Sequence, residues 1–223
     1  MQTQQARCLP EFDMFPSPSR DSSFLHQAGR TSSSQPRGEF PGLRQIVREV
    51  ETAWALRETS EVVGALNARM PSLIERYRPQ LAGWNATTAR SYRRVELHHC
   101  PVQGFQIVAM VWAPGQGTPV HDHRDQWGIE SVWQGELEVV DFAVKEDAGH
   151  LLRLEPSRVS LVAAGQSLGF TPEHGLHLCR NPSPRDVTVS LHIYARTLDT
   201  FNAYVDVADG WYERREHTPS LEF

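Results

Sequence analysis

Two histidines separated by one residue are the first feature of the chain that could carry chemistry. His121 and His123 flank Asp122 in the stretch GQGTPVHDHRDQWGIESVWQG, residues 115–135. Side chains alternate between the two faces of a strand, so a strand here directs both imidazoles to one face and Asp122 to the other. Two imidazoles so placed can bind one metal ion, and nitrogen ligands suit iron, zinc, copper or nickel. Because the chain holds 10 histidines in 223 residues, a surface strand with two titrating histidines explains the pair equally well.

Other residues around the pair follow a defined spacing. Gly115 lies six residues before His121, and Gly135 lies twelve residues after His123. A second segment contains a proline, a glycine, a histidine and an asparagine, namely Pro172, Gly175, His177 and Asn181. Together the two segments resemble the two sequence motifs of the cupin superfamily. The resemblance implies a small β-barrel in which His177 adds a third imidazole to the metal site.

One residue of the usual cupin pattern is missing. Gly128 occupies the position at which cupins usually carry a glutamate ligand. The resemblance therefore implies three neutral histidines without a carboxylate, whereas ferrous oxygenases more often combine two histidines with one carboxylate. Whether Glu130, His174 or Arg196 also reaches the pocket is left open by the sequence.

A later segment adds three polar side chains to one face of a predicted strand. Ser190, His192 and Tyr194 alternate with Leu191 and Ile193, so the polar residues share a face. A barrel strand with one solvated side would show the same pattern. Polar groups inside a small barrel need hydrogen-bond partners, and a metal pocket supplies them. We therefore assign these three residues to the pocket.

Longer segments around these residues resemble the cysteine dioxygenase family of thiol dioxygenases. The similar segments are Tyr92-Arg93-Arg94, FQIVAMVWAPGQGTPVHDH and GLHLCRN…VSLHIYARTLDT, within residues 85–205. The resemblance implies that His121, His123 and His177 bind Fe(II). It also implies that Arg94 pairs with the substrate carboxylate and that Tyr194 faces the substrate and oxygen.

The resemblance assigns supporting roles as well. Ser190 and His192 match a hydrogen-bonded relay that holds Tyr194 in place. Tyr92 is assigned to substrate binding, and Trp127 is expected to form a wall at the mouth of the pocket. In mammalian members the tyrosine is cross-linked to a nearby cysteine, but the matching position here is a glycine, so no cross-link can form there.

The expected chemistry follows from these residue types. Three neutral imidazoles leave a ferrous ion its full positive charge, so a thiol bound to that ion should lose its proton. A guanidinium such as that of Arg94 binds a carboxylate through two parallel hydrogen bonds, which selects thiols that are also acids. Both atoms of O2 would be transferred to the sulfur of L-cysteine to give cysteine sulfinate. Arg93 is the alternative anchor, but strand alternation is expected to turn it outward.

Short strands, which follow a helical segment in the sequence, must position the site. Runs rich in valine, isoleucine, leucine and aromatic residues are separated by turn residues. The predicted strands are 93–97, 105–112, 121–123, 128–133, 136–144, 151–154, 159–162, 168–170, 177–181 and 187–195. Many short strands at this spacing predict a mainly β sandwich or small barrel. The resemblance makes this a cupin-type β-barrel, or jelly-roll.

Before the strands, apolar residues recur with helical spacing. A first helix is predicted from Pro41, and a second from Thr59 or Ser60. Pro71 is expected to break the second helix and to leave a short third piece at 72–77. We expect these N-terminal helices to pack outside the barrel. The predicted organisation is a disordered leader at 1–38, a helical extension at 39–84, the thiol dioxygenase barrel at 85–205 and a C-terminal tail at 206–223.

Composition limits the possible partners. The net charge is −5, and no basic run has the density that nucleic-acid binding needs. No apolar stretch reaches the length of a membrane span, and the first residues lack a secretion signal pattern. Cys8, Cys100 and Cys179 form no CxxC pair, which fits free thiols in a reducing compartment. We therefore expect a cytoplasmic monomer or weak homo-oligomer that uses Fe(II), a small thiol and O2.

Three alternative functions stay open. The nearest keeps the reaction and changes the substrate to 3-mercaptopropionate or another small thiol acid. Bacterial enzymes of that type resemble this chain between Phe105 and His123 but usually carry glutamine at the position of Arg94. A non-enzymatic cupin that binds a metal or small ligand would not need the polar triad of the last strand. A different metal cupin, an isomerase or carbon-cleaving dioxygenase, would commonly retain the glutamate that Gly128 replaces.

Overall fold

The computed structural model describes residues 39–84 and 92–219, so the leader predicted at 1–38 lies outside the described residues. The helices are α1 (Leu43–Trp54), α2 (Thr59–Tyr77) and two short 3-10 helices, η1 (Arg78–Gln80) and η2 (Pro172–His174). The strands are β1 (Arg93–His99), β2 (Gln106–Trp112), β3 (Val120–His121), β4 (Gly128–Gln134), β5 (Glu136–Asp147), β6 (Leu151–Ala163), β7 (Ser167–Phe170), β8 (His177–Arg180), β9 (Thr188–Tyr194), β10 (Phe201–Ala208) and β11 (Trp211–His217). No helix in the two described ranges is long and apolar enough to cross a membrane.

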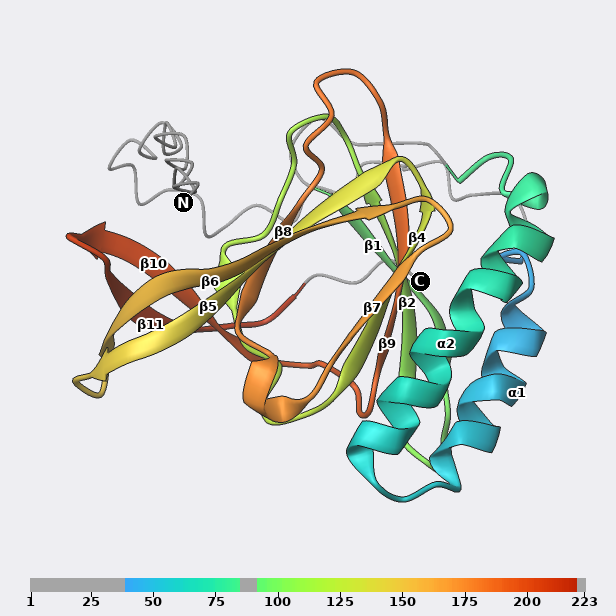
Figure 1. Ribbon diagram of the computed structural model, residues 1–223, viewed down its shortest axis with the longest axis horizontal. Helices are drawn as coiled ribbons and strands as arrows, with labels where there is room; N and C mark the ends of the chain where they lie inside the picture. The colour runs from blue at the N-terminus through green and yellow to red at the C-terminus, as the bar shows by residue number, and fades with distance from the viewer. Residues whose placement is uncertain (1–38, 85–91, 220–223) are drawn as a thin grey trace, which may run out of the picture. The chain divides into compact units, whose positions relative to one another are not determined.

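The strands form two antiparallel sheets. One has five strands in the order β1-β2-β9-β4-β7. The other has the order β10-β11-β6-β5-β8-β3 and closes into a barrel, because β3 also pairs with β10. Helices α1 and α2 lie beside the five-stranded sheet, and α2 contacts β4 and β7 (Figure 1). The fold is mainly β and has the predicted cupin-type jelly-roll architecture with helices packed outside.

The five-stranded sheet is buried on both faces because its side chains alternate between two cores. In β2, Ile107 and Val111 pack toward the helices, whereas Val108 and Met110 belong to the interior between the sheets. Alternate residues of β9, and of β1 and β4 up to the β-bulge in each, point into the same interior. The polar residues of the candidate site lie there.

Helix α2 is continuous through Pro71, so the predicted break into two helices is wrong. A proline inside a helix has no N–H to donate to the carbonyl four residues earlier, here that of Asn67. Ser167 of β7 replaces this donor, since its Oγ lies 2.9 Å from the Asn67 carbonyl oxygen. Buried side chains on both sides of the proline, Met70 and Leu73, hold the helix against the sheet.

The replacement of Ser167 by alanine tests this contact. Ser167→Ala is expected to lower the free energy of unfolding by about 1 kcal/mol, because the Asn67 carbonyl loses its donor in a partly buried position. Urea unfolding followed by circular dichroism measures the difference. Ser157→Ala is the control, since Ser157 is exposed on β6 and its loss should change stability by less than ~0.5 kcal/mol. Equal stabilities of the two variants would show that Ser167 does not support the helix.

Residues beyond 205 belong to the second sheet up to His217, rather than to the predicted C-terminal tail. β10 and β11 form a hairpin, and β10 pairs with β3 so that Ala203 lies opposite His121. The β11 sequence, WYERREH, lacks the apolar alternation that signals a half-buried strand. Backbone pairing with β10 and β6 places β11 in the sheet, which a search for apolar side chains does not detect.

Candidate metal centre

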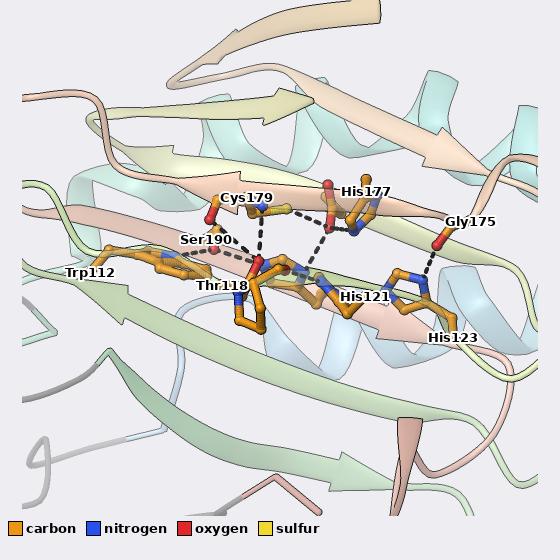
Figure 2. Close-up of polar contacts among 11 residues, drawn as sticks. Trp112, Thr118, His121, His123, Gly175, His177, Cys179 and Ser190 are labelled. Carbon is orange, nitrogen blue, oxygen red and sulfur yellow. Dashed lines mark hydrogen bonds and ion pairs between the residues drawn. The ribbon is translucent and has the colours of Figure 1, made fainter. Parts of the chain in front are cut away.

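The three predicted ligand histidines lie together in the interior. His121 ends β3, His123 follows two residues later, and His177 begins β8 directly opposite His121. The ring centroids are 4.8 Å apart for His121 and His123, 4.9 Å for His121 and His177, and 4.7 Å for His123 and His177. One nitrogen of each ring lies within 4.8 Å of the other two, and all three side chains are buried (Figure 2).

Hydrogen bonds fix the orientation of two of the rings. His123 Nδ1 lies 2.8 Å from the carbonyl oxygen of Gly175, and His121 Nδ1 lies 3.1 Å from that of Pro119. A carbonyl can only accept, so each Nδ1 carries the proton and each Nε2 keeps its lone pair. The Nε2 atoms of His123 and His177 are buried and have no hydrogen-bond partner among the described residues. Such nitrogens fit a metal ion of the iron or zinc type.

Burial also keeps the imidazoles of His121 and His123 neutral by lowering the pKa of each. Burial first, and then the neighbouring His177, lower the pKa of His121 to about 3. The pKa of His123 lies well below its usual value, through burial first and then through His177 and His121. Neutral imidazole is the form that binds a metal ion. The residues present therefore fit a three-histidine metal site.

The residue between the first two histidines ties them to the C-terminal hairpin. Asp122 turns to the opposite face, as strand alternation predicted. Its carboxylate accepts hydrogen bonds from Asn202 N at 3.0 Å, Asn202 Nδ2 at 2.6 Å and the Tyr204 hydroxyl at 3.0 Å. Both partners lie on β10. The hairpin of β10 and β11, which was predicted to be a tail, thus helps to position His121 and His123.

Gly128 leaves room for an aromatic ring beside the histidines. A Cβ at this position would lie 2.3 Å from Phe170 Cζ, which is too close for any side chain without movement of the ring. The Phe170 ring centroid lies 4.3 Å from that of His123 and 5.3 Å from that of His177. Phe170 therefore fills the space that a glutamate or cysteine at position 128 would need.

Strand β9 brings its polar residues to the interior, but their contacts differ from the predicted relay. Ser190 Oγ lies 2.8 Å from His192 Nε2 and accepts a hydrogen bond of 2.8 Å from Trp112 Nε1 (Figure 2). The His192 and Tyr194 rings are stacked with centroids 6.1 Å apart, and no hydrogen bond joins them in the described part of the chain. Burial raises the pKa of Tyr194 well above its usual value, although Arg94 lowers it, so the hydroxyl keeps its proton.

Arg94 lies in the interior next to Tyr194. Its Cζ is 6.0 Å from the centroid of the Tyr194 ring, and the His123 ring is 5.7 Å from the same centroid. The Arg94 side chain is 4% exposed, and its Nη2 lies 3.4 Å from Gln106 Oε1. Its Nη1 is buried without a hydrogen-bond partner among the residues described. A buried guanidinium with an unpaired N–H is suited to bind an anionic group.

Tyr92 lies on the interior side, whereas the predicted position of Trp127 needs correction. Tyr92 packs on Trp112, with ring centroids 4.4 Å apart. Trp127 lies in the core between the sheet and the helices, 5.6 Å from Trp54, so its predicted place at the mouth of the pocket is wrong. Alternation ahead of β4 turns its side chain away from the interior. Arg93 shares a face of β1 with Val95, which packs toward the helices, so it turns away from Arg94 as expected, but at 3% exposure it is buried there.

His174 and Arg196, which the sequence left open, have contacts of other kinds. His174 is exposed, and its Nδ1 lies 3.3 Å from Thr171 Oγ1. Arg196 donates from Nη2 to the carbonyl oxygen of Arg124 at 3.1 Å in an exposed position. The described groups of potential metal ligands contain neither residue.

Glu130, the third residue that the sequence left open, does reach the site. Glu130 is 1% exposed and lies two residues after Gly128, on the same face of β4. Its Oε1 is 3.4 Å from His177 Nε2 and 3.4 Å from His192 Nδ1. Burial raises the pKa of Glu130, but His177 and His192 outweigh it and hold the pKa below its usual value. Strand alternation counted from Gly128 is consistent with this position, because residues two apart share a face.

Known proteins show similarity over the same region. The family described as Cysteine dioxygenase type I matches residues 50–207. Cysteine dioxygenase type 1 from Bos taurus and from Homo sapiens are each 28% identical over 100 residues, which cover 45% of this chain and 49% of theirs. The chain thus spans about half the length of the curated relatives that it matches. A solved cupin superfamily protein from Desulfitobacterium hafniense has a TM-score of 0.37 and 12% identity, covering 50% of this chain and 84% of that one.

Proposed function

The chain belongs to the Cysteine dioxygenase type I family. We propose that it is an Fe(II)-dependent thiol dioxygenase acting on L-cysteine. The observation that carries the proposal is the group of three buried imidazoles whose nitrogens lie within 4.8 Å of one another. In the proposed reaction the thiol loses its proton, both atoms of O2 are bonded to sulfur, and cysteine sulfinate is the product.

His121, His123 and His177 would hold the metal ion, each through one nitrogen. Iron bound there would supply the redox chemistry with O2 and favour the thiolate form of the substrate. The carbonyl oxygens of Pro119 and Gly175 hold the first two rings through Nδ1, which keeps Nε2 directed to the interior. The burial of all three side chains excludes bulk water from their nitrogens.

Arg94 and Tyr194 would orient the substrate. The buried Arg94 guanidinium has an unpaired Nη1 and can bind the carboxylate of a small thiol acid. The Tyr194 ring lies next to both Arg94 and His123, so a molecule held between the guanidinium and the histidines would contact it. Because Tyr194 stays protonated, its hydroxyl can donate a hydrogen bond to the substrate or to oxygen.

The buried Arg94 favours an acidic substrate over a neutral or cationic thiol. It leaves 3-mercaptopropionate as the second candidate, because that thiol acid lacks only the amine. For the compartment we propose the cytoplasm, since Cys100 and Cys179 are both free thiols, as expected under reducing conditions.

A panel of thiols tests the proposed function. The full chain, loaded with Fe(II) under anaerobic conditions, is mixed with L-cysteine, 3-mercaptopropionate, cysteamine or a thiol-free acid such as alanine. O2 uptake and sulfinate formation are measured together. We expect the highest kcat/KM with L-cysteine, one O2 consumed per sulfinate formed, and no reaction with alanine. If 3-mercaptopropionate is turned over faster than L-cysteine, it becomes the assigned substrate. If no thiol yields a sulfinate, the proposed function is wrong.

A further inference from the structure

Glu130 is a buried carboxylate that the proposed reaction does not use. It lies on β4 between residues of two other strands, His177 and Cys179 on β8 and His192 on β9. Cys179 donates a hydrogen bond from Sγ to Glu130 Oε1 at 3.4 Å, and the same oxygen is 3.4 Å from both His177 Nε2 and His192 Nδ1. An ionised side chain in the interior needs such partners, since burial without them is strongly unfavourable. Its contacts therefore indicate a role in the site.

On the other side of His192, one of the two hydrogen bonds has a direction that its donor fixes. The indole Nε1 of Trp112 can only donate, so Ser190 Oγ accepts from it at 2.8 Å. The Ser190 proton is then free for the second partner of this oxygen, His192 Nε2, at 2.8 Å. An Nε2 that accepts a proton belongs to the tautomer of neutral imidazole that is protonated at Nδ1. Glu130 Oε1 lies 3.4 Å from this Nδ1, which is a charge contact rather than an aligned hydrogen bond.

From this geometry we infer that Glu130 is a positioning residue: its carboxylate holds His192 in the Nδ1-protonated form and places a negative charge beside His177. Hydrogen bonds connect Trp112 to Ser190 and Ser190 to His192, and the Glu130 carboxylate lies 3.4 Å from Nδ1 of His192. The charge lies next to one proposed metal ligand, where it stabilises a bound cation. The second part of the inference rests on the proposed metal site, whereas the first part concerns the protein alone.

Two variants separate the charge of Glu130 from its hydrogen-bonding capacity. Glu130→Gln keeps an acceptor oxygen and removes the charge. Glu130→Leu removes both and leaves a side chain of similar size. Glu136→Gln is the matched control, because Glu136 is exposed at the start of the next strand. Circular dichroism and thermal melting of each protein establish that the variants are folded.

The first measurement is the 15N spectrum of the histidine rings in the full-length, metal-free protein, with His192 assigned by loss of its signals in His192→Asn. We expect His192 to be protonated at Nδ1 in the parent, in Glu130→Gln and in Glu136→Gln. In Glu130→Leu its signals should shift toward the Nε2-protonated tautomer, because Nδ1 has lost its acceptor. A parent protein with His192 protonated at Nε2, or unchanged His192 signals in Glu130→Leu, would overturn the positioning role.

The second measurement is Fe(II) affinity, determined by competition with a chelator. Loss of an outer partner of a metal site commonly weakens binding by roughly 10–100-fold, so we expect about a tenfold loss in Glu130→Gln. Glu136→Gln should bind like the parent, and equal affinity of Glu130→Gln and the parent would refute the charge effect. If the parent binds Fe(II) and Glu130→Gln lowers that affinity while no thiol is oxidised, the proposed function fails and this inference holds. If the parent binds no Fe(II), the charge effect is refuted, and the 15N spectrum of His192 alone decides whether Glu130 positions that ring.

Discussion

Replacement of His177 by alanine is expected to remove iron from the protein. His177 contributes one of three buried imidazoles, and its Nε2 has no competing hydrogen-bond partner in the described structure. Replacing a residue that only hydrogen-bonds to a metal ligand commonly lowers metal affinity by about 10–100-fold. The loss of a ligand itself should therefore weaken Fe(II) binding by more than about 100-fold. Elemental analysis after anaerobic loading and desalting measures the metal content. Fe(II) should also raise the melting temperature of the parent and not that of the variant.

The Glu130 carboxylate, which lies near His177, requires an additional variant in this experiment. Glu130 Oε1 lies 3.4 Å from His177 Nε2, so it could move toward an ion when the ring is removed. The double variant His177→Ala, Glu130→Gln therefore accompanies the single variant and should show no higher iron content. His174→Ala is the matched control, because His174 is an exposed histidine three residues away on η2 and should keep the parent's iron. Full iron occupancy in both the single and the double variant would remove His177 from the site.

Strand alternation predicted much of the candidate site, because a period of two needs no knowledge of tertiary contacts. It directed His121 and His123 to one face and Asp122 to the other, and it turned Arg94 inward. The structure places these side chains as expected. The same rule applied to β4 would have turned Trp127 away from the interior and brought Glu130 into it. The sequence left open whether Glu130 reaches the pocket, because alternation gives the face of a side chain and not its contacts.

Other features depend on partners far away in the chain. Pro71 breaks a helix by local rules, and only Ser167, about a hundred positions later, supplies the missing donor to the Asn67 carbonyl. The β11 strand carries few apolar residues and is placed by backbone pairing with two neighbours. The relay from His192 to Tyr194 was implied by resemblance, but a contact between two side chains depends on rotamers. Here both ring nitrogens of His192 face other groups, Ser190 and Glu130.

Arg94, the proposed binding residue for the substrate carboxylate, is expected to have the second large effect on activity. Arg94→Ala should lower kcat/KM for L-cysteine by roughly 10–100-fold, which corresponds to about 1.5–3 kcal/mol for a lost hydrogen bond to a charged group. The physical reason is that the Arg94 guanidinium is 4% exposed, so a carboxylate bound there is shielded from water and has no equivalent partner in the variant. The change should appear mainly in KM, because the contact exists before and during the reaction. Initial rates of O2 uptake at varied cysteine concentration separate KM from kcat.

Cysteamine and a second arginine variant provide the controls for this anchor. Cysteamine has the thiol and the amine of cysteine but no carboxylate, so it should be a poor substrate whose kcat/KM is nearly the same in the parent and in Arg94→Ala. Arg196→Ala should behave like the parent, because Arg196 contacts a backbone carbonyl in an exposed position. Arg94→Lys keeps the charge and loses the planar pair of donors, so it should recover only part of the cysteine activity. If Arg94→Ala impairs both substrates equally, Arg94 does not bind the carboxylate. If the parent oxidises cysteamine faster than cysteine, the anchor role also fails and the enzyme acts on amine thiols instead.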